Sequence, residues 1–349
     1  MRTRRVRQVA VIYDGFRPGA AYPEHEREAS ESIREDAARI ERALRERGYA
    51  AFRLPFPRRG GDFYARLLAS GAEAIFNLCE GVHGDSRHEM NVCALLELAG
   101  IPYTGSPPLA LGLARDKALT KKILLSSGIP TPRFFISEGE VPRSLPRGMR
   151  YPLFVKPVRE DASIGIDRGS LVSHRGELTA RCRLIARRYG QPALVEDYID
   201  GRELNVSLLG NDRPMALPVS EIDMQRVPEA APRICDYRAK WVRKSGEYAS
   251  TVPVCPARLP GGAERRVRDA ALAAYRLMVC RGYARVDIRL GRSGIPYVLE
   301  VNPNPCIAPD AGFACSAAAA GLSYPDLISL IIELALRGDA VLRGLSRIG

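Results

Sequence analysis

Three oxygen-bearing side chains near the C-terminus, Asp287, Glu300 and Asn302, have the types and spacing to bind a hard metal ion. They lie between Gly282 and Pro305, a stretch that predicts two strands joined by a glycine-bounded turn. If the strands pair antiparallel, Asp287 comes close to Glu300. Two carboxylates and an amide oxygen, without His or Cys, suit magnesium better than zinc.

A surface hairpin explains the same pattern without any metal. Strand alternation places Arg285, Asp287 and Arg289 on one face, where an acidic residue could simply pair with arginine. An isolated match of this kind favours neither interpretation. The rest of the chain has to decide between them.

The lysines are the second group of residues with the chemistry of a site. Only six of the 52 basic residues are lysine. A chain so biased toward arginine has little reason to place lysine on its surface, whereas a compact ammonium contacts phosphate as a point charge. We therefore treat all six as candidate phosphate-binding residues: Lys117, Lys121, Lys122, Lys156, Lys240 and Lys244.

Length and composition indicate an ordinary globular protein. The 349 residues suit two or three packed units, and 46% hydrophobic with 26% charged residues is typical of soluble domains. The net charge of +12 suggests nucleic acid as one partner, but the basic residues are scattered among acids and no aromatic–basic motif accompanies them. We expect no nucleic-acid partner.

Cysteine usage and the N-terminus indicate the compartment. Eight cysteines without a CxxC pair predict reduced thiols, as in the cytosol. The apolar run Val9–Tyr13 is too short for a signal peptide, and no stretch reaches membrane-spanning length. The sequence therefore predicts a cytoplasmic protein that does not use a membrane.

Strands and helices alternate through the first hundred residues. The pattern predicts strands at 8–13, 49–54 and 74–78, and helices at 24–48, 63–70 and 89–99. Such alternation indicates an open, mostly parallel α/β domain ending near residue 104.

The remainder is more mixed. It predicts strands at 133–136, 153–155, 193–198 and 203–209, and helices at 113–127, 176–189, 263–280 and 324–336. Two polar segments, 159–169 and 224–250, are predicted as loops, and a structureless stretch as long as the second is usually functional or mobile.

Several short motifs in order resemble the D-alanine–D-alanine ligase family of the ATP-grasp superfamily. The resemblance runs from about Val9 to the C-terminal helix. Its motifs are GIPYTGS at 100–106, DK at 116–117, FVKP at 154–157, VE at 195–196, GRE at 201–203, DYRAK at 236–240, RVD at 285–287 and LEVN at 299–302.

The resemblance implies an ATP-grasp fold, combining α/β and α+β parts. An N-terminal open parallel α/β domain would cover 1–104, a small central subdomain 105–194, and a C-terminal α+β subdomain with the metal site 195–349. The last two would clasp ATP between them.

It also implies roles for individual residues. The nucleotide would be held by Lys117, Lys156 and Lys240 at the phosphates, Phe154, Glu196 and Tyr198 at the adenine, and Glu203 at the ribose hydroxyls. Asp287, Glu300 and Asn302 would hold two magnesium ions, with manganese as an alternative, and Arg285 would face the reacting carboxylate.

The substrate half departs from the family. The family loop Gly-Ser-Ser is Asp161-Ala162-Ser163 here, so the first serine is lost. The second remains as Ser163, a candidate catalytic residue with Arg285, Lys240 and Glu26. The tyrosine after Lys240 is Trp241. Glu26, which would bind a substrate ammonium, has therefore lost both of its family partners.

The leading interpretation is an ADP-forming ligase that joins an amino acid or small carboxylate to an amino acid or peptide amine through an acyl phosphate. One alternative is a D-alanine–D-alanine ligase of peptidoglycan precursor synthesis. An alternative of another class is a non-catalytic ATP-binding protein, which would not require Arg285 together with the three metal-ligand residues. Family members are commonly homodimers, and these residues do not test that.

Overall fold

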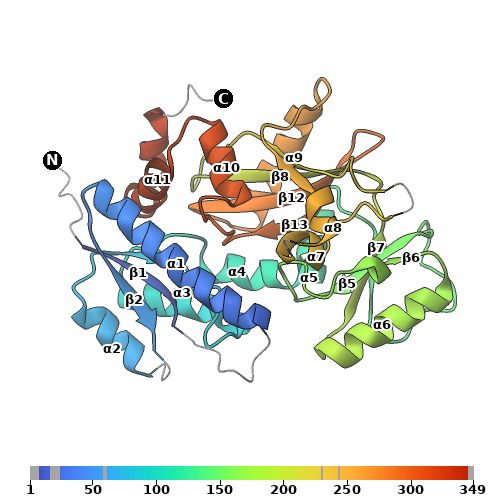
Figure 1. The fold of residues 1–349 in the computed structure, drawn as a ribbon, viewed down its shortest axis with the longest axis horizontal. Coiled ribbons are helices and arrows are strands. Elements are labelled where there is room, and N and C mark those ends of the chain that lie inside the picture. Colours follow the sequence, from blue (N-terminus) through green and yellow to red (C-terminus); the bar gives the residue numbers. More distant parts are fainter. Residues whose placement is uncertain (1–7, 16–23, 58–60, 229–230, 243, 345–349) are drawn as a thin grey trace.

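The computed structural model describes residues 8–15, 24–57, 61–228, 231–242 and 244–344. Three sheets organise this part of the chain. Figure 1 shows them in succession along the ribbon: blue at the N-terminus, green in the middle and orange toward the C-terminus.

The N-terminal sheet is parallel, as predicted. Its order is β2 (Ala50–Phe56), β1 (Gln8–Asp14), β3 (Ala74–Asn77), and every residue of β3 is buried. The helices of this part are α1 (Glu24–Glu46), α2 (Gly61–Ala69) and α3 (Glu89–Ala99). Because parallel sheets are covered on both faces, their strands read as continuous apolar runs, which is how β1 is recognised in the sequence.

The predicted helix 113–127 is confirmed over most of its length, but its start is wrong, because the structure has two helices there. They are α4 (Pro108–Arg115) and α5 (Lys117–Ser126). Between them Asp116 leaves the helical conformation, and its carboxylate accepts a hydrogen bond from the Leu119 N–H at 3.0 Å. Asp116 therefore caps a new helix instead of continuing the old one, which places Lys117 at the first position of α5.

The central sheet is antiparallel, in the order β4 (Phe134–Ser137), β7 (Ala193–Asp197), β5 (Leu153–Pro157), β6 (Leu171–Val172). The predicted helix near 176–189 is α6 (Arg175–Tyr189), which packs on β5. Strand β7 passes through residue 194, where we place the boundary between the central and C-terminal subdomains, and both boundaries stay a prediction.

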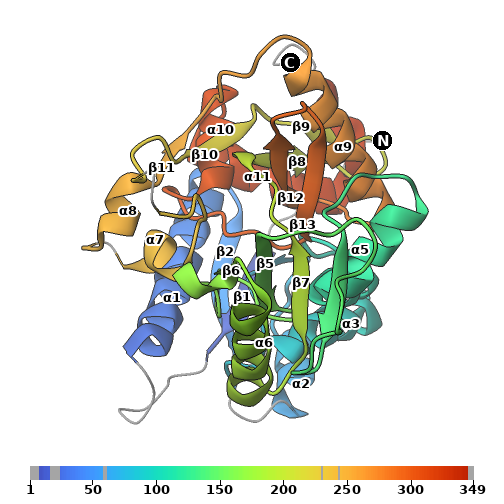
Figure 2. The same cartoon turned by 90° about the vertical axis from the view of Figure 1, so that its right-hand side faces the viewer.

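The C-terminal sheet contains the predicted hairpin. Its order is β11 (Val252–Val254), β10 (Ser220–Asp223), β8 (Gly201–Leu209), β12 (Tyr283–Gly291), β13 (Pro296–Asn302), with β9 (Met215–Ala216) on β8. Strands β12 and β13 pair antiparallel with Asp287 opposite Glu300, as the turn chemistry predicts. Figure 2 shows this sheet above the central one, behind which α5 lies.

The other helices of this part include three that the sequence did not indicate. The segment 224–250, predicted as an irregular loop, contains α7 (Tyr237–Trp241) and α8 (Gly246–Ser250), capped by Asp236 and Ser245. Helix α10 (Gly312–Ala319) was missed because its Ala-rich sequence lacks an amphipathic period. The predicted helices near the end are α9 (Ala263–Leu277) and α11 (Tyr324–Arg337), and short 3₁₀ turns lie at Ser86–His88, Arg168–Ser170 and Gly338–Gly344.

Helix α11 joins the first and last parts of the chain. Its apolar face shares one core with β1, β3 and α1 on one side and with Phe313 and Tyr283 on the other. The eight cysteines are free thiols. Within the described part, no single helix has the length and apolar composition of a membrane span, although the bent pair 312–319 and 324–342 passes that test jointly.

Candidate active site

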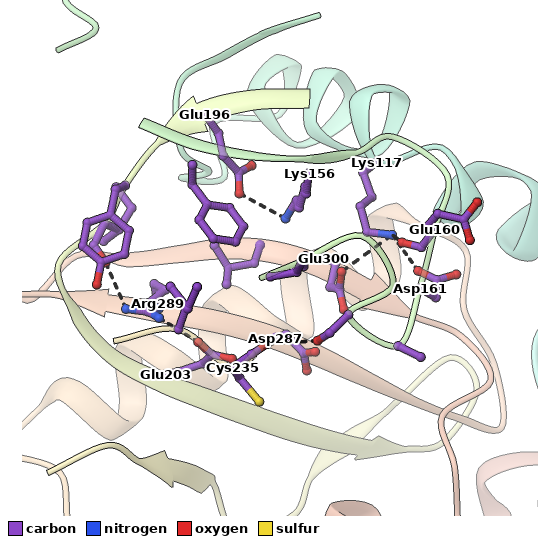
Figure 3. Close-up of a pocket in the computed structure, with 18 of the residues that line it drawn as sticks. Lys117, Lys156, Glu160, Asp161, Glu196, Glu203, Cys235, Asp287, Arg289 and Glu300 are labelled. Atoms are coloured by element: carbon purple, nitrogen blue, oxygen red, sulfur yellow. Dashed lines mark hydrogen bonds and ion pairs between the residues drawn. The ribbon is translucent and has the colours of Figure 1, made fainter. Parts of the chain in front are cut away.

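The largest group of predicted site residues lines one cleft between the central and C-terminal sheets. It has an empty volume of about 730 Å³. Ten predicted residues line it: Lys117, Phe154, Lys156, Ser163, Glu196, Tyr198, Glu203, Lys240, Asp287 and Glu300. Figure 3 shows most of these side chains pointing into the same space.

Lys117 lies at one end of the cleft, held almost entirely by acceptors. Its Nζ donates to the Glu160 carbonyl and to Asp161 Oδ1, both at 2.6 Å, and lies 3.8 Å from Glu300 Oε2 (Figure 3). Burial alone would lower the pKa of Lys117, but the Asp161 and Glu300 carboxylates outweigh it and raise that pKa. Lys117 is therefore a fixed cation whose present partners are one backbone carbonyl and two carboxylates.

Lys156 and Lys121 share the carboxylate of Glu196. Each Nζ lies 3.0 Å from one Glu196 oxygen. Lys121 is wholly buried and also donates to Thr131 Oγ1 at 2.7 Å. Burial lowers the pKa of Lys121 to about 8, whereas the two lysines hold the pKa of Glu196 below its usual value despite burial. Glu196 thus stays ionised in a site where an unpaired carboxylate would be costly.

The register of β5 and β7 explains how this group forms. Phe154 pairs opposite Glu196, and Lys156 stands two residues further on the same side of β5. The Lys156 ammonium lies 5.9 Å from the centre of the Phe154 ring. An aromatic face, a carboxylate and an ammonium therefore meet on one wall of the cleft, a combination suited to a base and its attached phosphates.

The predicted metal-binding side chains meet where β12 pairs with its two neighbours. Asp287 stands opposite Glu300 of β13 on one side and Asn205 of β8 on the other, and Arg285 stands opposite Asn302. Burial alone would raise the pKa of Glu300, but Lys117, Lys156, Lys240 and Arg285 hold it down at about 2. Glu300 is therefore an ionised oxygen ligand at any ordinary pH.

Both oxygens of Asp287 already have partners. Arg285 donates to them through Nε at 2.7 Å and Nη2 at 2.8 Å, and Asn205 Nδ2 donates to Oδ1 at 2.7 Å. Asn302 Oδ1 accepts from the Asn304 N–H at 3.1 Å. A metal here would share these oxygens with their present donors.

The donor set fits magnesium better than a protein-only metal cage. No group of three or more His, Cys, Asp or Glu side chains that could hold a metal occurs among the described residues. Two carboxylates and one amide oxygen leave several of the six positions of Mg²⁺ open for phosphate oxygens and water, as magnesium prefers. The site therefore suits an ion that arrives with a nucleotide.

Two segments close over the cleft and contact each other. Ser163 Oγ donates to the Cys235 carbonyl at 3.0 Å, and the Tyr237 N–H donates to the Ile166 carbonyl at 3.2 Å. An ion pair of 3.0 Å joins Arg168 to Glu247. These contacts hold the 159–169 loop against the segment that contains Lys240. We call the latter the covering segment.

Four other residues, of which only Glu26 and Trp241 were considered in the sequence analysis, are less well defined. Glu26 lies in α1, but its side chain, like that of Trp241, is outside the described residues. His83 Nε2 lies 2.9 Å from the Pro57 carbonyl oxygen and is committed to the N-terminal domain. Cys306 as a whole residue is exposed. The protein packed around its sulfur nevertheless raises the pKa of the thiol to about 11, which leaves it a poor nucleophile.

Two acids near the cleft were not singled out as ligands by the sequence. Glu80 is exposed to solvent, but the protein packed around its carboxyl raises the pKa of that group to about 7. The negative charge of Asp161 contributes to the same shift. Burial raises the pKa of Glu89 to about 8, although Asn304 Nδ2 donates to it at 2.8 Å. Neither acid is among the residues that line the cleft, but both are close enough to Asp161 for its charge to raise their pKa values.

Comparisons with known proteins agree on one family. A family model described as "D-ala D-ala ligase C-terminus" matches residues 127–333. The chain is 34% identical over 310 residues to the D-alanine–D-alanine ligase of Pelotomaculum thermopropionicum, covering 86% of this chain and 91% of that protein. It is 39% identical over 270 residues to the "Uncharacterized protein y4sG" of Sinorhizobium fredii, covering 77% and 76%.

Solved structures give the same answer over the whole chain. The D-alanine–D-alanine ligase of Bacillus anthracis complexed with ATP has a TM-score of 0.73 at 25% identity, covering 99% of this chain and 100% of that one. A second structure of the same enzyme has a TM-score of 0.73 at 27% identity with the same coverage. The ATP-grasp fold expected from the sequence is confirmed.

Proposed function

The chain belongs to the D-alanine–D-alanine ligase family of ATP-grasp carbon–nitrogen ligases, and from this premise we propose that it binds ATP and forms D-alanyl-D-alanine. The relatives favour this narrower alternative over the general carboxylate–amine ligase. The observation that carries the proposal is the convergence of Lys117, Lys156, Glu203 and the Asp287–Glu300 pair in one cleft.

The nucleotide would lie along the cleft from Phe154 to Lys117. Phosphate oxygens would replace the carboxylates that now contact the Lys117 and Lys156 ammonium groups. Phe154 and Glu196 would contact the base, and Glu203 the ribose hydroxyls. Lys240 would approach the phosphates from the covering segment. The hydrogen bond from Ser163 to the Cys235 carbonyl holds that segment against the 159–169 loop.

Asp287, Glu300 and Asn302 would hold magnesium. When bound, magnesium would neutralise charge on the transferring phosphoryl group. Arg285 would keep Asp287 ionised and oriented through its two hydrogen bonds. It would also present positive charge to the oxygen that becomes negative at the acyl carbon.

The reaction then has two steps. A carboxylate oxygen of the first D-alanine bonds to the γ-phosphorus while the bond to ADP breaks, giving an acyl phosphate. The amine of the second D-alanine, having lost its ammonium proton, bonds to the acyl carbon, and inorganic phosphate leaves. The 159–169 loop, held by the Ser163 hydroxyl, would exclude water that could otherwise hydrolyse the acyl phosphate.

A second candidate is a ligase of this class with a different amino-acid pair. It is favoured by Asp161 and Ala162, which stand where the family has Gly-Ser. A polar site discriminates strongly when a buried partner is left unpaired. Both residues line the proposed nucleotide cleft, and Asp161 contacts Lys117, so they would affect the site where substrate and phosphates meet.

The test is ADP release by the purified protein with ATP and magnesium. D-alanine, L-alanine and a panel of amino acids and dipeptides are supplied singly and in pairs, and products are identified by mass. We expect D-alanyl-D-alanine. Another amide as the main product would support the second candidate, and ATP binding without any product would favour a non-catalytic protein. Glu300→Gln, which we expect to lose turnover, separates this activity from that of a contaminant.

A further inference from the structure

Arg289 lies in the middle of β12 and faces the nucleotide cleft. The sequence places it only on the same face as Asp287. In the structure it is 5% exposed and lines the cleft. A buried guanidinium has to be matched by several acceptors, so its contacts reveal what it does.

Its contacts surround the position proposed for the ribose. Nη2 donates to Glu203 Oε2 at 2.8 Å and to the Arg233 carbonyl at 2.5 Å. Nη1 donates to the carbonyls of Ile199 and Gly201 at 3.3 and 3.5 Å. Figure 3 shows Arg289 directed at Glu203 on the side of the cleft opposite Lys117. One planar group thus joins a carboxylate, the β7–β8 turn and the covering segment.

The cross-strand register makes this arrangement specific. Arg289 stands directly opposite Glu203 in the β12–β8 pair. Tyr198 covers the guanidinium, with its ring centre 5.5 Å away, and donates its hydroxyl to the same Arg233 carbonyl at 3.2 Å. Lysine could not replace this set, because a single ammonium cannot span a carboxylate and carbonyls on both sides of it.

We propose that Arg289 is a positioning residue that determines how tightly the site recognises the ribose hydroxyls. It holds Glu203 through Oε2, so that Oε1 is presented to the ribose in one orientation. It also anchors the Arg233 carbonyl, from which the chain continues to Lys240. The inference rests on the proposed nucleotide binding, and it does not depend on which amino acids are joined.

The test measures nucleotide binding by calorimetry, with magnesium and without amino-acid substrates. The ligands are ATP, 2′-deoxy-ATP and 3′-deoxy-ATP, and the proteins are the wild type, Arg289→Met and Arg289→Lys. We expect the wild type to bind ATP at least about tenfold more tightly than one of the deoxynucleotides, as a hydrogen bond to a charged group implies. In Arg289→Met this preference should fall to about twofold or less, and Arg289→Lys should restore little of it.

Two further variants make the result specific. Arg292→Met removes an 81% exposed arginine of the same hairpin, which pairs with Asp200, and should leave the preference unchanged. Glu203→Gln should lose the preference by itself, and adding Arg289→Met to it should change the preference no further, because both act through one carboxylate. If Arg289→Met does not fold, the Lys variant carries the measurement.

Three results would overturn the inference. Equal weakening of all three nucleotides in both Arg289 variants would mean that Arg289 only maintains the fold. A wild-type protein that binds all three equally would remove the ribose contact itself. Normal ATP binding with an unchanged preference in the variants would overturn only the role of Arg289. A wild-type protein that binds no ATP is a separate outcome, and it would overturn the proposed function on which the inference rests.

Discussion

Replacing Asp161 with asparagine should tighten ATP binding. The Asp161 carboxylate lies 2.6 Å from the Lys117 ammonium, which we propose as a phosphate ligand. A phosphate oxygen can reach that ammonium only after Asp161 withdraws, and the carboxylate then repels the phosphates. Asparagine keeps the size of the side chain and removes the charge, so both unfavourable effects decrease together.

The magnitude follows from how exposed the pair is. The Lys117 side chain is 4% exposed, but that of Asp161 is 63% exposed, so solvent screens the pair strongly. Pairs with an exposed partner contribute about 0.2–1 kcal/mol. Since about 1.4 kcal/mol corresponds to a tenfold change, the dissociation constant of ATP should fall by roughly 1.4- to 5-fold.

Calorimetry of ATP binding with magnesium measures this change directly. The difference between wild type and Asp161→Asn should shrink from low to high salt, because a surface pair is screened. Asp200→Asn is the matched control, since Asp200 pairs with the surface residue Arg292. Unchanged or weaker ATP binding in Asp161→Asn would refute the competition for Lys117.

Two other predictions concern stability. Lys121→Met should lower the free energy of unfolding by about 3–5 kcal/mol, because it leaves the buried Glu196 carboxylate with one lysine in place of two. Lys122→Met, at the exposed neighbouring position, should change the free energy of unfolding little. Similar denaturant midpoints for the two variants would contradict this prediction. The pKa of Glu89 is about 8 in the folded state and about 4.3 in the unfolded state. Between these pH values the folded state holds a proton that the unfolded state has lost. Stability therefore falls as pH rises from about 4.3 to about 8. Glu89→Gln should therefore flatten the fall of the melting temperature from pH 5 to pH 9 in metal-free buffer, and an unchanged slope would show that Glu89 does not titrate there.

Local patterns predicted the features that depend on neighbouring residues. The β12–β13 hairpin and the Asp287–Glu300 contact follow from strand alternation and one glycine-bounded turn. The rarity of lysine drew attention to Lys117 and Lys156, which the structure places in one cleft. For the hairpin the information lies within about twenty residues of chain, whereas the rarity of lysine is a property of the whole composition.

Features that join distant segments were not predictable in this way. The pairs Glu203–Arg289 and Asn205–Asp287 require β8 to lie beside β12, and their residues are more than eighty positions apart. Lys121 looks like any polar residue of a helix, because periodicity gives its face and not its partner. The break at Asp116 was missed since an aspartate can either continue a helix or cap the next one.

Strand β12 also fixes the distance between the proposed ribose contact and the proposed metal site. The Arg289–Glu203 pair, proposed for the ribose, and the Asp287–Asn205 pair, proposed beside the metal, are two residues apart, about 7 Å along one strand. Inserting or deleting a single residue between positions 287 and 289 would put Arg289 and Asp287 on opposite faces of the sheet. Length variation in this enzyme should therefore be tolerated in the 291–295 turn and excluded from the strands on either side of it.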